Sequence, residues 1–289
     1  MATCARSIPV SKQAPRAEVR AFRTLAWFAA LLALCYAPLL GGLVRQWAAD
    51  ENMTHGFLVP FAAGYIVWQR RGLIGVGSRP NFWGLLVAAC GAAQMLAGTI
   101  AGQLLLARTA FLVSLAGAVL FLGGTRAIRA LAFPLFLLLF LFPIPAILYA
   151  RITLPLQLFA SNAGELVLNA LGIPVLRDGN ILELASRRLS VAEACSGIRS
   201  LVSLAFLALI YVRFFEPSRW IRCMVVFATV PSAIAVNALR VALTGVIGQY
   251  RADLAEGSLH LLASWVLFLV SSLLIVAFHR LVRPCRNFS

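Results

Sequence analysis

The chain alternates between long apolar runs and short polar segments that are rich in arginine. Runs of about 20 apolar residues are long enough to cross the hydrocarbon core of a bilayer as helices. The pattern therefore predicts an all-α integral membrane protein with about eight transmembrane helices. We expect these spans at 24–44, 56–68, 82–101, 104–122, 128–149, 196–212, 220–243 and 260–279.

The interval 150–193, between the fifth and sixth spans, is more polar than the spans around it. Its first part has helical periodicity, with Asn162, Glu165 and Asn169 on one polar stripe. A crossing here would reverse the sides of the later arginine-rich loops. The pattern therefore favours an interfacial helix, or one packed in the helical bundle, over a further span.

A turn signal, Asp178-Gly179-Asn180, follows between alternating apolar residues and predicts a short β-hairpin. No internal repeat or low-complexity linker divides the rest of the chain. We expect a cytoplasmic N-terminal segment, 1–23, followed by a single polytopic membrane domain, 24–289. The first span is expected to be retained and not cleaved as a signal peptide.

The arginines at the ends of the spans predict the orientation. Clusters precede the first span and follow the second, fourth, sixth and eighth spans, and with eight crossings all five lie on one side of the membrane. By the positive-inside rule that side is the cytoplasm. The sequence therefore predicts a multi-pass protein with both termini cytoplasmic and the segment 150–193 outside.

Composition changes this picture only by excluding other classes. With 61% hydrophobic and 12% charged residues, a soluble domain would lack a polar surface. A net charge of +15 would suggest nucleic acid in a soluble protein. Here the arginines lie at the ends of the spans and are explained by membrane topology. No basic block is interleaved with aromatic residues, so we expect no nucleic-acid partner. The six cysteines show no metal-type spacing, and we expect no metal and no cofactor.

Three polar side chains are predicted to converge at the outer face from consecutive spans. Cys195 stands at the start of the sixth span, Arg240 near the outer end of the seventh, and His260 at the start of the eighth. A thiol needs a base or a positive neighbour to ionise, and an imidazole can take its proton and return it to a leaving amine. A guanidinium can stabilise an oxyanion. The trio is therefore typical of a thiol hydrolase or transferase.

Each of the three residues also has a purely structural explanation. Cys195 can pack as a small apolar residue. Arg240 can reach the interface, or pair with Asp253 or Glu256. His260 can simply begin a helix in the interface. The residue types alone leave these alternatives open.

Four further residues are candidates for supporting roles. Ser196 and Asn237 could donate hydrogen bonds near the thiol. Glu193 could orient an arginine or the substrate, or cap the sixth span. His55 begins the second span on the same outer face, and its alternative is an ordinary interfacial histidine.

Several segments resemble a known family. "VAEACSGIRSL", "NALRVALTGVIG" and "HLLASWVLF", in that order, are similar to motifs of the exosortase/archaeosortase family of membrane cysteine transpeptidases. "HGFLVPFAAGYIVWQRR" and "GIPVLRDGNILEL" also resemble family motifs. The catalytic cysteine, arginine and histidine proposed for that family match Cys195, Arg240 and His260.

The resemblance implies a bacterial inner-membrane enzyme with its active site on the periplasmic side. Such enzymes act on exported proteins that carry a C-terminal sorting tail of a Pro-Glu-Pro-type motif, a transmembrane helix and an arginine-rich end. They are thought to cleave near the motif through a cysteine acyl-enzyme and to transfer the protein to an acceptor, here unknown. Their genes often accompany exopolysaccharide production. Membrane lipid is the expected partner of the basic tail end.

Two other functional classes fit the sequence less well than a cysteine transpeptidase. A transporter or flippase, linked to exopolysaccharide export, would be favoured by inverted repeats and intramembrane carboxylates, and the sequence shows neither. A thiol redox enzyme needs a cysteine pair. Cys195 and Cys223 are predicted on opposite faces of the membrane, which disfavours that chemistry.

Overall fold

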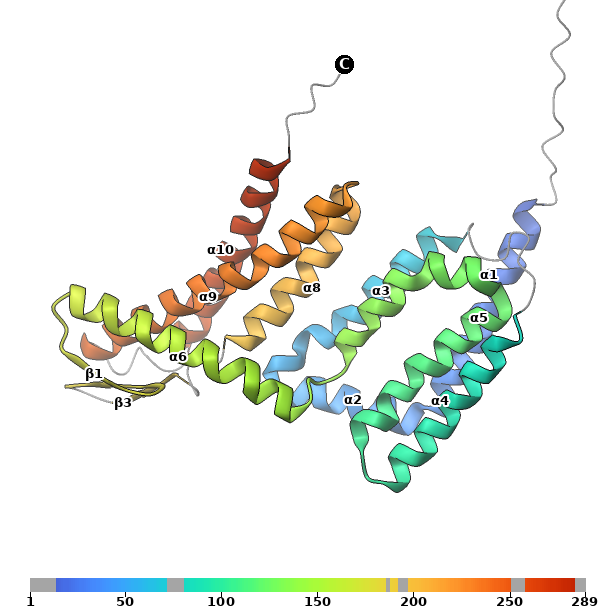
Figure 1. Ribbon diagram of the computed structural model, residues 1–289, viewed down its shortest axis with the longest axis horizontal. Helices are drawn as coiled ribbons and strands as arrows, with labels where there is room; N and C mark the ends of the chain where they lie inside the picture. The colour runs from blue at the N-terminus through green and yellow to red at the C-terminus, as the bar shows by residue number, and fades with distance from the viewer. Residues whose placement is uncertain (1–13, 72–80, 186–187, 192–196, 251–257, 284–289) are drawn as a thin grey trace, which may run out of the picture. The chain divides into compact units, whose positions relative to one another are not determined.

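The computed structural model describes residues 14–71, 81–185, 188–191, 197–250 and 258–283. Helices make up most of this part of the chain, and short strands occur between residues 175 and 190. The chain divides into two compact units, Met1–Pro143 and Ile144–Ser289. Figure 1 labels the helices and strands of both units.

The first unit begins with two helices that meet at a sharp bend at Tyr36. The direction of the chain bends by 79° between the segments Phe22–Cys35 and Ala37–Ala49. Pro38 lies in the first turn of the second helix, where a missing N–H is tolerated. The buried Tyr36 hydroxyl lies 2.8 Å from Ser114 Oγ, which holds the bend against α5. The elements of this unit are α1 (Ala14–Cys35), α2 (Ala37–Ala49), η1 (Glu51–Phe57), α3 (Leu58–Gln69), α4 (Trp83–Ile100), α5 (Leu104–Leu137) and η3 (Leu138–Leu141).

Glycines on α4 allow it to pack closely against α5. A Cβ atom on Gly98 would lie 2.5 Å from the backbone nitrogen of Ala107, and one on Gly91 would lie 2.7 Å from that of Ser114. Without side chains at these positions the two backbones can approach each other. The buried glycines of α4 stand seven residues apart, at Gly84, Gly91 and Gly98.

α5 contains a break at Gly124, where φ is 65° and ψ is −167°. Residues with a Cβ rarely adopt this conformation. Figure 1 shows the ribbon changing direction sharply within α5. This break lies between the predicted spans 104–122 and 128–149, and the predicted end of the second span at 149 is too late. Helical structure stops at Leu141 because Pro143 and Pro145 follow.

In the second unit, three long helices form a bundle. α8, α9 and α10 pack against one another, as Figure 1 shows. Leu204, Val225 and Ile275, one from each helix, belong to its buried core. The elements of this unit are α6 (Ala146–Ala170), β1 (Val175–Asp178), β2 (Ile181–Leu184), β3 (Arg188–Ser190), α8 (Ile198–Phe215), α9 (Arg219–Tyr250) and α10 (Ser258–Val282).

α6 and a small antiparallel sheet pack on the C-terminal half of α9. A Cβ atom on Gly164 of α6 would lie 2.7 Å from Val241 Cγ1 of α9. The sheet has the order β1-β2-β3, with Gly179 at a positive φ of 60° between β1 and β2. Leu182 and Val191 are fully buried in the same apolar cluster as Val241. The segment that leads to Cys195 is therefore anchored on α9.

The membrane class predicted from the sequence is confirmed. Within the described residues, five helices are long and apolar enough to cross a bilayer, or six if the bent pair α1–α2 is one span. Large apolar side chains such as Ile100 and Phe227 are exposed on them, as lipid-facing positions require. The count is lower than the expected eight because Leu104–Leu141 counts as one helix of 38 residues, although it is broken at Gly124 between two predicted spans. In addition, α3, where the span 56–68 was predicted, has only 12 residues. α6 is not among the candidate spans.

Candidate functional site

α9 presents two polar side chains to the first turn of α8. Arg240 Nη2 donates a hydrogen bond to Ser200 Oγ over 3.1 Å. Three residues earlier, Asn237 lies on the same face of α9 and is only 4% exposed. Its amide lies against Gly197, the residue that caps α8. Asn237 and Arg240 thus contact the residues just before and just after the start of α8.

Gly197 is the residue where the chain turns into α8. Its φ is +68°, in the left-handed region that favours glycine. A Cβ atom at this position would lie 3.0 Å from Asn237 Nδ2 and 3.2 Å from its Cγ. Both the backbone conformation and the close approach therefore require glycine. Cys195 stands two residues before it in the sequence.

The chain is also anchored just before the cysteine segment. The backbone N–H of Val191 donates to the carbonyl oxygen of Asn180 over 3.0 Å. The side chain of Asn180 in turn donates from Nδ2 to Gln157 Oε1 of α6 over 3.1 Å. The residues on both sides of the segment 192–196 are consequently attached to the α6–α9 framework.

The backbone of His260 lies near the start of α10, and its side chain is outside the described residues. At the other end of α10, His279 Nε2 lies 2.9 Å from Glu216 Oε2. On α10, His260 precedes His279 by 19 residues, a helical rise of about 28 Å. On α8, Ser200 precedes Glu216 by 16 residues, a rise of about 24 Å. His260 and Ser200 therefore lie at these distances from the contact between His279 and Glu216. Because α10 packs against α8 and α9, the start of α10 lies within about one helical turn of the level of Ser200.

The remaining candidates have different outcomes. Cys195, Ser196 and Glu193 lie outside the described residues, as do Asp253 and Glu256, the alternative partners of Arg240. The structure brings together two of the predicted residues, Arg240 and Asn237. Among the described residues no group of three or more His, Cys, Asp or Glu side chains could hold a metal ion.

His55 is in the first unit and is buried there, with 6% of its surface exposed. Its ring packs edge-on against Phe140 at a centroid distance of 6.5 Å. Burial lowers the pKa of His55 below its ordinary value of 6.5, although backbone hydrogen bonds with Phe140 and Asn52 act in the opposite direction. Next to it, a Cβ atom on Gly56 would lie 2.7 Å from Trp47 Nε1. These contacts give the "HGF" motif a packing role.

Sequence reasoning did not identify Ser200 or Gly197 as parts of the site. Ser200 is one turn into α8 and looks like an ordinary helical serine. Its contact with Arg240 depends on how α8 and α9 cross. Gly197 offered a signal, since a glycine directly before a long apolar run favours a positive-φ cap.

The transmembrane exosortase family model matches residues 47–277, from the end of α2 to the last turns of α10. The match includes residues of both units and all three predicted catalytic positions. No curated protein and no solved structure matches the chain. Since the matched region covers well over half of the sequence, the protein belongs to the transmembrane exosortase family.

Proposed function

We propose that this exosortase is a cysteine transpeptidase that cleaves the C-terminal sorting signals of exported proteins. Cys195 is the nucleophile, Arg240 stabilises the oxyanion, and His260 is the general acid and base. One observation carries the proposal. Asn237 contacts Gly197 and Arg240 contacts Ser200 at the start of α8, which begins three residues after Cys195.

The surroundings of Arg240 suit an oxyanion donor. Its Nη2 is held by Ser200, which orients the planar guanidinium. Its Nε–H is buried and makes no hydrogen bond within the described part of the chain. A fixed donor with unused capacity can stabilise negative charge that develops only in the transition state.

The reaction proceeds in two steps through a thioester. His260 takes the proton of the Cys195 thiol, and the thiolate attacks the scissile carbonyl carbon, so that negative charge forms on the carbonyl oxygen beside Arg240. The C–N bond then breaks, and the imidazolium of His260 gives its proton to the leaving amine. In the second step His260 deprotonates an acceptor amine or water. Attack on the thioester releases the product and restores Cys195.

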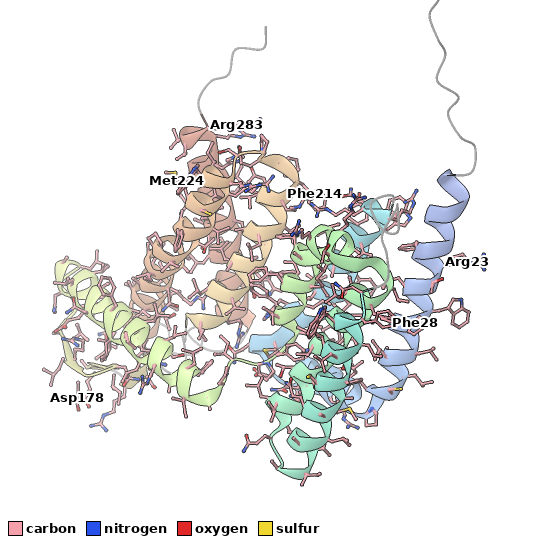
Figure 2. All side chains as sticks on the ribbon, turned by 45° about the vertical axis from the view of Figure 1, so that its right-hand side comes forward. Arg23, Phe28, Asp178, Phe214, Met224 and Arg283 are labelled. Atoms are coloured by element: carbon pink, nitrogen blue, oxygen red, sulfur yellow. The ribbon has the colours of Figure 1, made fainter. Side chains whose placement is uncertain are left out.

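The distribution of arginines supports the proposed orientation. Arg213, Arg219 and Arg283 lie at the end of the second unit where α8 passes into α9 and α10 ends. Figure 2 shows Arg283 at that end and Asp178, on β1, at the opposite end. By the positive-inside rule the arginine end is cytoplasmic. The Gly197–Asn237 end then faces the periplasm of a bacterial inner membrane, and both termini are cytoplasmic.

The substrates follow from family membership. We expect exported proteins with a sorting motif, a transmembrane helix and an arginine-rich end. The basic end would meet the anionic lipid surface, since the arginine-rich end of this enzyme would repel it.

A processing assay tests the catalytic assignment. The enzyme is co-expressed with a reporter that carries a Pro-Glu-Pro-type tail, and cleavage is followed by gel mobility. Cys195→Ala should abolish cleavage, whereas Cys223→Ala, an exposed cysteine on α9, should leave it unchanged. Arg240→Lys should lose most activity because a point charge cannot replace the planar fork. Arg219→Lys on the same helix is its control. Wild-type cleavage by Cys195→Ala would refute the proposal.

The orientation has a separate test. In variants that retain a single cysteine, a membrane-impermeant maleimide added to intact spheroplasts should label Cys195 and spare Cys223. Cys223 stands five residues into α9, near the proposed cytoplasmic end. Labelling of Cys223 alone would reverse the orientation and leave the catalytic assignment to the processing assay.

A further inference from the structure

Arg108, on α5 in the first unit, is a charged residue that the proposed reaction does not use. It lies within a candidate membrane span and is only 9% exposed. It is four residues after Leu104, where α5 begins, and so lies about 6 Å from the end of the helix. That depth corresponds to the boundary between the hydrocarbon core and the headgroups of a bilayer.

The guanidinium of Arg108 is only partly satisfied by the protein. Nη1 donates to Gln46 Oε1 of α2 over 2.6 Å. Nε is buried without a hydrogen-bond partner, and Nη2 donates to no acceptor within the described residues. Asp50, the carboxylate that follows α2, accepts hydrogen bonds from the backbone and side-chain nitrogens of Asn52 and caps η1. In the described part of the chain, Arg108 therefore has no anionic partner.

A buried guanidinium cannot become neutral by losing its proton, so Arg108 keeps its charge without a counter-charge in the described part of the chain. An ionised group that leaves water without a counter-charge loses far more free energy than one amide hydrogen bond returns. Ionisable residues inside membrane spans are accordingly paired or functional. Among the described residues, no acidic side chain supplies this negative charge to Arg108.

The surroundings of Arg108 indicate which negatively charged group would suit it. Nε is buried, so Nη2, which makes no hydrogen bond among the described residues, is the nitrogen that can donate to an oxygen of a phosphate or carboxylate. Gly42 of α2 faces Nη2 and has no side chain to cover it; a Cβ atom there would lie 3.5 Å from Nη2. One turn before Arg108 on α5, Leu104 is 59% exposed and apolar, as a lipid-facing residue would be. Lipid headgroups lie at this depth.

We propose that Arg108 and Gln46 form a binding site for the phosphate of an anionic phospholipid. Nη2 of Arg108 donates to a phosphate oxygen, and Nη1 remains bound to Gln46. The lipid neutralises the buried charge and attaches to the protein between α2 and α5. This site is independent of the proposed transpeptidase reaction.

Native mass spectrometry of the full-length protein in neutral detergent tests the proposal. Phosphatidylglycerol and phosphatidylcholine are added in equal amounts, and the lipids that remain bound are counted. The wild type should retain phosphatidylglycerol preferentially. Arg108→Gln should weaken that binding by about tenfold, the effect of losing one charge-assisted hydrogen bond or more. Arg45→Gln, an exposed arginine next to Gln46, is the matched control and should bind like the wild type.

A second variant keeps the charge of Arg108 and covers its Nη2. Gly42→Leu should also reduce phosphatidylglycerol binding, while its melting temperature without lipid shows that it is folded. Equal retention of phosphatidylglycerol by the wild type and Arg108→Gln would overturn the proposal. So would protection of the wild type from heat by inorganic phosphate alone, which would identify a free anion. Loss of acidic-peptide binding in Arg108→Gln, with lipid binding unchanged, would assign the site to a protein carboxylate and also refute it.

Discussion

His279 Nε2 lies 2.9 Å from Glu216 Oε2, and both side chains are buried. On its other side, His279 Nδ1 lies 2.9 Å from the hydroxyl of Tyr211 on α8. Glu216 Oε1 also accepts the backbone N–H of Ser218 over 2.7 Å, between α8 and α9. This network ties the last turns of α10 to the connection between the other two helices of the bundle.

Glu216→Leu should destabilise the second unit. The substitution removes the acceptor of the buried His279 ring and of the partly buried Ser218 N–H, which costs about 3 kcal/mol. Thermal or denaturant unfolding in mild detergent measures the loss. Arg283→Gln is the matched control, because its side chain is 57% exposed and lies 3.9 Å from Glu216. It should change stability by less than about 0.5 kcal/mol. Equal losses in the two variants would contradict a special role for the buried network.

His55 should make stability depend on pH. Because burial lowers its pKa below 6.5 in the folded protein, the unfolded chain takes up a proton first as the pH falls. The stability contributed by the neutral, buried ring is thus complete above about pH 6.5 and is lost below it, down to the folded pKa.

The measurement compares melting temperatures of the wild type and His55→Gln between about pH 7.5 and about pH 5.5. The wild type should fall more steeply on acidification, while His260 and His279, present in both proteins, contribute equally. Parallel curves would show that His55 does not titrate differently on unfolding.

The sequence predicted the extents of the apolar helices better than a bend within one of them. The expected spans 82–101 and 196–212 correspond to α4 and α8 within three residues at each end, because an apolar run has few stable alternatives in lipid. The break at Gly124 falls between the predicted spans 104–122 and 128–149, whereas the bend at Tyr36, inside the predicted span 24–44, was not predicted. Proline and glycine indicate where a helix can break, but packing against other helices decides whether it does.

For the candidate site, the sequence predicted which residues share one face of α9 better than it predicted the residues that this face contacts. Asn237 and Arg240 are three residues apart, so a helix places them on one side whatever surrounds it. Their partners Ser200 and Gly197 depend on the crossing of α8 and α9, which hydrophobic periodicity does not encode. The roles of Cys195 and His260 stay predictions.

Gly91→Ala should separate α4 from α5. A Cβ atom at this position would overlap Ser114, at 2.7 Å from its backbone nitrogen, and would disturb the Ser114–Tyr36 hydrogen bond. We expect a loss of about 1–3 kcal/mol in unfolding free energy from this overpacking. Gly64→Ala on α3 has nothing within 4 Å of the new Cβ and should gain up to about 1 kcal/mol from helix propensity. A Gly91→Ala protein as stable as the wild type would show that the helix pair can relax.

Gly197→Ala should impair processing of a tailed reporter more than it impairs folding. Gly197 and Gly172 both have positive φ angles, 68° and 75°, so alanine at either position strains the backbone by about 1 kcal/mol. Only at Gly197 would the new Cβ also meet a neighbour, Asn237 Nδ2 at 3.0 Å; at Gly172 nothing lies within 4 Å. The shared backbone strain should therefore cost the two variants similar stability. Gly197→Ala alone should shift Asn237 and the start of α8 and lower the rate of reporter cleavage. Equal cleavage by the two variants would mean that the contact between Asn237 and Gly197 does not position the residues that carry out the reaction.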